Sequence, residues 1–460
     1  MIESIKPFLV RMSKALYAFV SMCLFAVCIG IRYYDFSQLS GLVFFVHLLY
    51  IIIFVLAIRI YNGFDIGLSR VSILIYSQTL ANCITIGIAY LFFSLKQGKL
   101  VSILPFIILL VAQFFWNIIW SLLTNRLYFY RYIPRRSIVI YAQKLDLLRL
   151  NEIFAYPKKF SVEKMIENPE DDLETLLDTI AGFEAVFVSG INECLRNGIL
   201  EYCLKQNIRC YVAPSIGDII LQGAKHLELL SVPVFRTMRA APSIEYLFAK
   251  RCFDIVVSLL ALIVLSPLML FVAIAICLYD NGPAIYKQVR LTKDGKHFEI
   301  YKFRSMKVSA ESDGVARLAS DNDDRITPIG KVIRACRFDE LPQLLNILKG
   351  DMSIVGPRPE RPEIAAQYEK DIPAFSLRLQ VRAGLTGFAQ VFGRYNSDPY
   401  SKLEMDLMYI NKMSFIEDLR LIFATVKILF MKESTSGISV SKVQKESSAN
   451  QCENTGVKNL

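Results

Sequence analysis

The chain has little of what histidine- and cysteine-based sites need. Its 460 residues include three histidines, at positions 47, 226 and 297, so a histidine triad or a histidine metal cluster is not indicated. Its ten cysteines contain no CxxC pair, which argues against a zinc site and a disulfide framework. We therefore expect reduced and mostly buried thiols. What the sequence has in abundance is long apolar runs and basic residues.

Four apolar runs open the chain. Hydrophobic residues make up 54% of the sequence and the mean hydropathy is +0.39, which is too apolar for a wholly soluble protein. The runs lie at 15–31, 41–60, 72–95 and 100–123, each close to the ~20 residues that cross a bilayer. The first run lacks a small-residue cleavage site and three more follow, so we interpret it as a retained helix. Residues 1–125 are predicted to form a four-helix transmembrane domain.

Basic residues flank these runs unevenly, in a chain whose net charge is +10 and whose pI is about 9.0. Nine lie on one side of the predicted membrane: Lys6, Arg11, Lys14, Arg59, Arg70, Arg126, Arg131, Arg135 and Arg136. Three lie on the other side: Arg32, Lys96 and Lys99. The positive-inside rule then places both ends of the bundle in the cytoplasm. We assign the basic excess to flanks that face anionic lipid and to phosphate-bearing substrates, and expect no nucleic-acid partner.

The spans themselves argue against one alternative function. A transporter or channel built on these helices would need charged or polar residues within them, and the runs contain almost none.

Residues 126–245 are predicted to form a Rossmann-like α/β cytoplasmic domain. Short β-branched runs, "SIVIY", "AVFVS", "IRCYV" and "VPVF", alternate with helical segments at 173–182 and 191–205. The turn after the first strand, "YAQKLD", has no glycine that would let backbone amides approach a pyrophosphate. A sugar-nucleotide dehydratase or epimerase would need that glycine fingerprint. We therefore interpret this domain as a packing or regulatory domain that binds no dinucleotide.

Residues 246–283 contain a fifth apolar segment, Ile255 to Leu278, which is long enough to span. Ser266 and Pro267 lie in its middle, where proline removes a backbone hydrogen bond. Both flanks are basic, and a fifth crossing would carry everything downstream out of the cell. A helix that is broken at this pair, enters one leaflet and returns would satisfy these constraints, with the serine hydroxyl bonding the freed carbonyl. A kinked ordinary span is the alternative.

Residues 284–432 are soluble in composition, and their resemblance to a known family implies a mainly α catalytic domain. Residues 433–460, which are polar and rich in Ser, Asn and Lys, are predicted to form a disordered tail. Basic residues recur in the catalytic domain among Gly and Pro turns, which would hold side chains in place. Arg358 lies between two prolines in "VGPRP". Guanidinium groups bind phosphate bidentately and lysines bind it as point charges. The predicted set of substrate- and phosphate-binding residues is Arg290, Lys302, Arg304, Arg334, Arg358, Arg382, Gln390 and Arg394.

Two adjacent carboxylates, Asp339 and Glu340, stand among these cations in "RFDELPQ". Helix chemistry alone could explain them, because Asp is a good N-cap, leucines follow at helical spacing, and Gly350 stands where such a helix would end. The pair also suits phosphoryl chemistry. A carboxylate can attack phosphorus, and Mg²⁺ is held by one or two carboxylates together with substrate phosphates. Neighbouring helix positions point about 100° apart, so the two carboxylates should have different roles.

From about residue 249 to 432 the chain resembles the bacterial sugar transferase family, the polyprenyl-phosphate hexose-1-phosphate transferases. The resemblance lies in gapped motifs in the same order: "KRCFDIVVSLLALIVLSP", "YKFRSM", "RITPIGKVIRACRFDELPQLLNILKGDMSIVGPRPE" and "RAGLTGFAQVFGR". The four spans and the α/β domain resemble, by architecture alone, the N-terminal part of the long members that initiate exopolysaccharide, capsule or O-antigen synthesis. Two departures are apolar replacements: Phe338 before the carboxylate pair, and Phe388 where the family usually has "GW".

The resemblance implies that Asp339 attacks the β-phosphate of a UDP-sugar, releasing UMP and leaving a phosphosugar on the enzyme. Undecaprenyl phosphate would then accept the phosphosugar. It implies Mg²⁺ near Asp339, assistance from Glu340, and phosphate binding by Lys302, Arg334 and Arg358. Ser266 and Pro267 match the family's helix-breaking pair.

The resemblance also implies a multi-pass protein of the bacterial inner membrane with its catalytic domain on the cytoplasmic face. The long members favour a hexose such as glucose or galactose, although an N-acetylated sugar also fits. The oligomeric state stays open, and a homo-oligomer and downstream glycosyltransferases are compatible with the sequence as partners.

Overall fold

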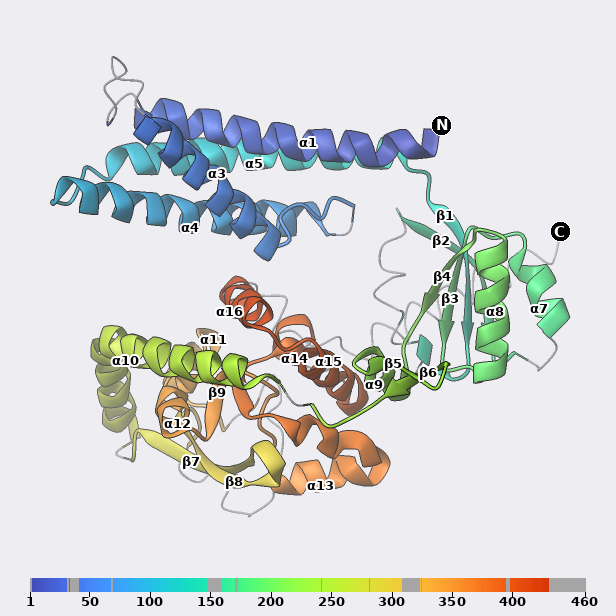
Figure 1. Cartoon of the computed structure of the whole chain (residues 1–460). Helices are drawn as coiled ribbons and strands as arrows, with labels where there is room; N and C mark the ends of the chain where they lie inside the picture. Colours follow the sequence, from blue (N-terminus) through green and yellow to red (C-terminus); the bar gives the residue numbers. More distant parts are fainter. Residues whose placement is uncertain are drawn as a thin grey trace, which may run out of the picture. The chain divides into compact units, whose positions relative to one another are not determined.

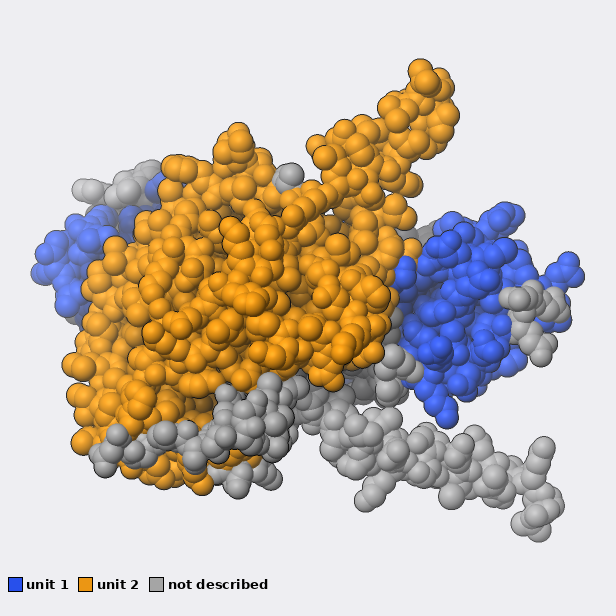
Figure 2. All heavy atoms as spheres, turned by 90° about the horizontal axis from the view of Figure 1, so that it is seen from below, with its two compact units in different colours: residues 1–215 blue, residues 216–460 orange. Residues whose placement is uncertain are grey.

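The computed structural model describes residues 2–30, 33, 41–67, 69–144, 146–147, 150, 159–169, 173–240, 242–280, 282–307, 323, 325–393 and 398–429. The chain divides into two compact units, Met1–Ser215 and Ile216–Leu460 (Figure 2). Unit 1 contains the N-terminal helices and a parallel sheet, and unit 2 contains the helix with Ser266 and Pro267 and the carboxylate pair (Figure 1). The predicted tail 433–460 lies outside the described residues.

Four apolar helices begin unit 1, as predicted. They are α1 (Ile2–Phe25, continued by the π-helix η1, Ala26–Gly30), α3 (Gly41–Ile60), α4 (Val71–Gln97) and α5 (Leu104–Arg131). Three of them are long and apolar enough to cross a membrane, over Phe8–Gly30, Val71–Gln97 and Leu104–Tyr130. The second apolar run contains a shorter apolar helix, Phe44–Ile60 within α3.

The expectation that these spans contain almost no polar residues is wrong. Their described parts bury a set of uncharged side chains that includes Ser77, Gln78, Asn82, Gln113, Asn117 and Ser121. Tyr17 Oη donates to Asn117 Oδ1 at 2.7 Å, and Gln113 Nε2 donates to Tyr50 Oη at 2.7 Å. Helices packed together can hold amides inside because each amide finds a partner on a neighbouring helix. Among the described residues of these helices the buried polar side chains carry no charge.

A four-stranded parallel sheet follows in unit 1, in the order β2-β1-β3-β4. Its strands are β1 (Arg135–Tyr141), β2 (Phe160–Glu167), β3 (Ala185–Ser189) and β4 (Arg209–Val212), with α7 (Leu173–Ile180) and α8 (Glu193–Lys205) between them. Successive residues of β1 alternate between two hydrophobic clusters, one with Ile138 and Ile140 and one with Val139 and Tyr141. The sheet is thus covered on both faces, which fits the predicted α/β class. Strand β2 was not anticipated.

Residues 216–245, which we predicted as part of the middle domain, belong to unit 2. They form α9 (Ile216–Gln222) and an antiparallel hairpin of β5 (Lys225–Leu229) and β6 (Val232–Arg236). Asn411 Nδ2 donates to Ile219 O at 2.6 Å and ties α9 to the catalytic domain. The predicted strand "VPVF" is therefore a hairpin strand and not part of the parallel sheet.

Unit 2 is mainly α, as predicted, and also contains three two-stranded sheets, one of which is the β5–β6 hairpin. Its remaining elements are α10 (Ile244–Asp280), β7 (Ile285–Leu291), η2 (Lys293–Gly295), β8 (His297–Phe303), α11 (Pro328–Ala335), η3 (Phe338–Glu340), α12 (Gln343–Lys349), β9 (Met352–Val355), α13 (Pro362–Asp371), η4 (Pro373–Gln380), β10 (Ala383–Thr386), α14 (Phe388–Phe392), α15 (Pro399–Asn411) and α16 (Phe415–Leu429). β7 pairs antiparallel with β8, and β9 pairs parallel with β10. One core cluster joins Ile354 of β9, Leu344 of α12, Leu407 of α15 and Leu421 of α16.

Helix α10 contains Pro267 and bends sharply into two limbs (Figure 1). Ser266 Oγ donates to Ile263 O at 2.8 Å, which satisfies the carbonyl that the missing proline N–H leaves free. This hydrogen bond confirms the predicted role of the serine. Many large apolar side chains of α10, among them Val256, Val264 and Phe271, are exposed, as expected of a helix surrounded by lipid.

The first limb of α10 is fastened to the catalytic domain by three charged residues. Lys250 Nζ lies 2.7 Å from Asp418 Oδ2 on α16. Arg251 donates to two carbonyls at the end of α12, Ile347 O at 2.6 Å and Leu348 O at 2.9 Å. Asp254 Oδ1 accepts from Ile354 N–H of β9 at 3.1 Å. Lys250 and Arg251, which we interpreted as a basic flank, therefore have protein partners.

The expectation of mostly buried thiols is also wrong. Of the cysteines within the described residues only Cys203 is buried, whereas five are exposed: Cys83, Cys194, Cys252, Cys277 and Cys336. Cys83 and Cys277 lie on apolar helices, where lipid can take the place of protein as a covering. All nine described cysteines are free thiols, as predicted.

We predict that α10 turns back within one leaflet, so that its two ends lie on the same side of the membrane. Because Lys250 is buried, suitable reporters are the exposed positions Glu245→Cys and Lys287→Cys in a cysteine-free chain. A membrane-impermeant maleimide should label neither in intact cells and both after lysis. Labelling of Lys287→Cys from outside would mean that α10 spans.

The double substitution Ser266→Ala with Pro267→Ala should change this topology. It restores a straight apolar segment over 255–278, about 36 Å long at 1.5 Å per residue, against a hydrocarbon core of about 30 Å. The straightened segment should tend to span, and Lys287→Cys should then become reactive in intact cells.

Candidate active site

Glu340 lies at the centre of a buried cluster of charges drawn from three parts of unit 2. Lys302, at the end of β8, places Nζ 3.4 Å from Glu340 Oε1. Arg358, from the loop after β9, donates from Nη2 to the same oxygen at 3.0 Å. The Glu340 side chain is 13% exposed, so its charge is balanced by these two cations and only slightly by water. The structure therefore brings together three of the predicted site residues.

Asn346 is a residue of this region that sequence reasoning missed. It is fully buried on α12, and its amide inserts into the edge of β8: Oδ1 accepts from Tyr301 N–H at 2.9 Å and Nδ2 donates to Glu299 O at 2.7 Å. Lys302 is the next residue of that strand. The Asn346 amide thus fixes the strand that carries Lys302 against the helix that follows the carboxylate pair. Its position within an apolar helix, "QLLNILK", is the signal that could have revealed it.

The predicted helix with Asp339 as its N-cap is wrong at its start. Residues Phe338–Glu340 form the 3₁₀ turn η3, α12 begins only at Gln343, and no side-chain capping bond is made at either start. Pro342 has no N–H to continue an α-helical ladder from Phe338, so the chain uses shorter bonds here. The predicted end is confirmed: Gly350, with φ of 95°, caps α12.

The two neighbouring carboxylates have different surroundings, and the different roles that we predicted for them stay a prediction. Burial alone would raise the pKa of Glu340, but the charges of Arg358 and Lys302 outweigh it and hold the pKa at about 2. Burial, followed by the charge of Glu340, raises the pKa of Asp339. Among the described residues the Asp339 side chain makes no hydrogen bond or ion pair. Glu340 therefore anchors the cations, while Asp339 stays available beside them.

Cations continue around this pair. Arg334 of α11 lies close enough to counteract the rise in the pKa of Asp339. Arg290 of β7 is largely buried and donates from Nη1 to Pro359 O at 3.1 Å. Burial, reinforced by the nearby charge of Arg358, lowers the pKa of Arg290 to about 10. Arg290 thus supports the loop of Arg358, and its predicted contact with phosphate stays a prediction.

The other predicted site residues lie apart from Glu340 or outside the described residues. Arg304 is buried near Gly282, beyond the second limb of α10, and Arg382 is exposed where β10 begins. Gln390 donates to Leu385 O at 3.2 Å, within its own turn. Arg394 falls outside the described residues. For these residues a role in substrate binding stays a prediction.

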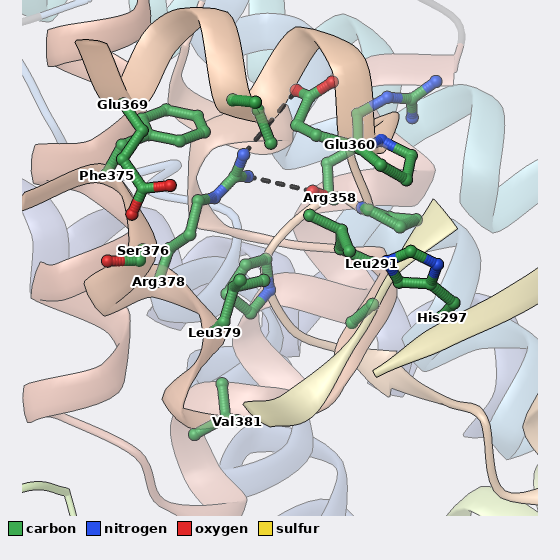
Figure 3. A pocket seen from close by; sticks show the side chains of 16 residues that line it. Leu291, His297, Arg358, Glu360, Glu369, Phe375, Ser376, Arg378, Leu379 and Val381 are labelled. Carbon is green, nitrogen blue, oxygen red and sulfur yellow. Dashed lines mark hydrogen bonds and ion pairs between the residues drawn. The ribbon is translucent and has the colours of Figure 1, made fainter. Parts of the chain in front are cut away.

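A cavity of about 190 Å³ is lined by the loop Pro357–Glu360, but not by the carboxylate pair or Lys302 (Figure 3). Phe375 and Arg378 of η4 also line it, and most of its other lining residues are apolar. Figure 3 shows the guanidinium group of Arg378 turned toward Glu360 and toward the backbone of Arg358.

The predicted Mg²⁺ stays a prediction, and Asp339 is the carboxylate of the pair that has no side-chain partner among the described residues. Among the described residues no group of three or more His, Cys, Asp or Glu side chains could hold a metal ion alone. Mg²⁺ is commonly bound by one or two carboxylates together with substrate phosphates. Glu340 Oε1 is engaged by Lys302 and Arg358, so Asp339 is the carboxylate that would hold the ion.

The comparisons with known proteins place the similarity in unit 2. The profile of a family described as "Bacterial sugar transferase" matches residues 245–432. A UDP-N-acetylgalactosamine-undecaprenyl-phosphate N-acetylgalactosaminephosphotransferase of Aeromonas hydrophila is 44% identical over 191 residues, which are 41% of this chain and 45% of the relative. A UDP-glucose:undecaprenyl-phosphate glucose-1-phosphate transferase of Klebsiella pneumoniae is 41% identical over 212 residues, 45% of each protein.

A third relative is matched almost end to end. The exopolysaccharide production protein PSS of Rhizobium leguminosarum bv. phaseoli is 44% identical over 189 residues, which are 39% of this chain and 94% of the relative. The chain thus spans less than half the length of the first two relatives and nearly all of the third.

The charge balance at Glu340 predicts a pH dependence of stability. Because the folded pKa lies below the ordinary value of 4.5, ionised Glu340 contributes stability above about pH 4.5, which is lost as the pH falls toward 2. The contribution is on the order of 3 kcal/mol. Substituting Arg358→Met should raise the pKa of Glu340 and move this loss to higher pH. Thermal unfolding in detergent with a chelator, between pH 3 and 7, measures it.

The matched control is Glu340→Gln, which cannot titrate at this position. Its stability should lack the component that wild type loses below pH 4.5. An Arg358→Met variant whose pH profile coincides with that of wild type would contradict the assignment.

Proposed function

Because the chain belongs to the bacterial sugar transferase family, we propose that it transfers a sugar 1-phosphate from a UDP-sugar to undecaprenyl phosphate. The products are undecaprenyl-diphosphate-sugar and UMP. The observation that carries the proposal is the arrangement of Asp339, which has no side-chain hydrogen bond among the described residues, beside Glu340 and its two cations. A diphosphate brings at least two negative charges, and the surplus of cations here would receive them.

In the first step, a carboxylate oxygen of Asp339 attacks the β-phosphorus of the UDP-sugar. A bond forms between that oxygen and phosphorus, and the bond from phosphorus to the oxygen that bridges the two phosphates breaks. UMP leaves with the electron pair, and the sugar phosphate stays on Asp339. The raised pKa of this carboxyl favours the step, since a more basic carboxylate is the better nucleophile once ionised.

In the second step, a phosphate oxygen of undecaprenyl phosphate attacks the same phosphorus and displaces Asp339. Lys302 and Arg358 are the side chains best placed to hold phosphate oxygens, because both reach the carboxylate next to the nucleophile. Glu340 keeps these cations in position and is not itself consumed. Arg334 adds a further positive charge on the side of α11.

Mg²⁺ would be held by Asp339 together with substrate phosphates. When bound, it would neutralise charge that develops on the phosphate oxygens.

The acceptor explains why this domain needs a membrane helix. UDP-sugar is water-soluble, whereas undecaprenyl phosphate keeps its tail in hydrocarbon and its phosphate at headgroup level. The bent α10, packed on α12 and β9, would hold the catalytic domain at that boundary. We place the protein in the bacterial inner membrane with the catalytic domain on the cytoplasmic face, where nucleotide sugars are available.

The sugar is left open by the relatives. The names of two of them refer to N-acetylgalactosamine and glucose, and the name of the third refers to exopolysaccharide production. We infer that the protein catalyses the first membrane step in the synthesis of a surface polysaccharide. Incubating membranes with undecaprenyl phosphate and a panel of UDP-sugars, and recording which one releases UMP, identifies the donor.

Substituting Asp339→Asn should reduce UMP release by at least about a thousandfold, because the amide has a similar shape but is not a nucleophile. Glu340→Gln should reduce it about a hundredfold, since it leaves Lys302 and Arg358 without their carboxylate. The measurement is UMP release by purified full-length protein at matched folded concentrations.

The matched control is Glu363→Gln, an exposed carboxylate in the first turn of α13, which should release UMP at the wild-type rate. Normal turnover by Asp339→Asn would rule out this residue as the nucleophile.

A covalent route should also appear before any lipid acceptor is added. UDP-sugar alone should yield a burst of UMP of up to one equivalent per enzyme, and label from a radioactive sugar should stay on the protein. Peptide mass spectrometry should locate that label at Asp339. Release of UMP only when both substrates are present, without labelled protein, would favour direct transfer instead.

A further inference from the structure

The loop Pro357–Glu360 carries Arg358, and its shape depends on its carbonyl groups, because the two prolines have no N–H to donate. Four consecutive carbonyls accept hydrogen bonds: Pro357 O from Gly384 N–H at 2.9 Å, Arg358 O from Arg378 Nη2 at 2.9 Å, Pro359 O from Arg290 Nη1 at 3.1 Å, and Glu360 O from Leu291 N–H at 3.0 Å. Two of these donors are side chains rather than backbone. The backbone of the residue that reaches Glu340 is therefore held by Arg378 directly.

Arg378 is almost completely buried, and Figure 3 shows its guanidinium group turned toward Glu360 and toward the Arg358 carbonyl. Besides the Arg358 carbonyl, it lies 2.7 Å from Asp406 Oδ2 on α15 and 3.6 Å from Glu360 Oε1. The exposed fractions of the Arg378 and Asp406 side chains are 3% and 1%. The donors of a guanidinium group are fixed in one plane and so hold these partners in one arrangement, whereas the donors of an ammonium group rotate about a single bond. The guanidinium group thus links α15 to the loop next to the carboxylate pair.

Folding stability alone does not account for this arrangement. A buried ion pair is often no more stabilising than apolar residues of the same volume, because both charges lose their water. Arg378 Nε, moreover, is buried without a hydrogen-bond partner among the described residues. The pair instead fixes geometry: the Arg358 side chain is 41% exposed, and the direction in which it leaves the loop depends on how its backbone is held.

We propose that Arg378, held by Asp406, is a positioning residue that keeps Arg358 directed at Glu340 during the transfer reaction. Arg378 does not line the carboxylate cluster and acts through the backbone of Arg358. Its effect on catalysis rests on the proposed function, whereas its effect on the loop does not.

The test combines Arg378→Lys with Arg358→Lys in the full-length protein. Arg378→Lys keeps the positive charge beside Asp406 but lacks the planar guanidinium group. We therefore expect kcat/KM for UMP release to fall about tenfold or more, with little change in unfolding temperature. In the Arg358→Lys background the same substitution should have a much smaller effect, because the side chain that it positions is already changed. The control is Arg136→Lys in unit 1, which removes the exposed hydrogen bonds between the Arg136 guanidinium group and the Glu163 carboxylate. It should leave kcat/KM unchanged.

Hydrogen–deuterium exchange of the peptide 353–361 supplies a readout that needs no substrate. Exchange should be faster in Arg378→Lys and in Asp406→Asn than in wild type, and unchanged in Arg136→Lys. Wild-type exchange in both variants would overturn the proposal, as would fully multiplicative effects of Arg378→Lys and Arg358→Lys on kcat/KM. If the wild-type protein releases no UMP, the proposed function fails, and the exchange result still decides whether Arg378 anchors the loop.

Discussion

The buried charge of Glu340 is the constraint on which the catalytic half depends. A carboxylate this far from water is tolerable only beside cations, and it finds them in Lys302 and Arg358, from chain segments on either side of it in the sequence. To make these contacts, β8, η3 and the loop after β9 must converge. The amide of Asn346 then fixes β8 against α12, and Arg378 fixes the loop. Asp339, next to Glu340, is thereby placed among positive charges.

A second set of contacts joins this site to the apolar helix. Lys250, Arg251 and Asp254 lie within one and a half turns of α10, yet each holds a different element of the catalytic domain: α16, α12 and β9. The lipid-facing helix and the carboxylate pair consequently belong to one packed body. For an enzyme that takes one substrate from water and the other from a membrane, such a connection fixes how the site meets the boundary between them.

Several features could be predicted because they depend on neighbouring residues. The apolar helices followed from runs of suitable length, three strands of the parallel sheet from β-branched clusters, and the end of α12 from Gly350. Two other predictions were wrong. Asp339 is not an N-cap, because Pro342 interrupts the expected helix. The spans do contain buried amides such as Asn117, because partners on other helices accommodate them.

The sequence by itself determined the membrane character of the chain, the bend at Pro267 and the supply of cations around an adjacent Asp and Glu. These are properties of composition and local stereochemistry, and they can be recognised without knowing which segments meet. Only the tertiary structure decided that Glu340, rather than Asp339, takes Lys302 and Arg358, that Lys250 pairs with Asp418 instead of facing lipid, and that Arg378 holds the Arg358 carbonyl. Each of these pairings joins residues from 18 to 168 positions apart, and such choices depend on how whole elements pack.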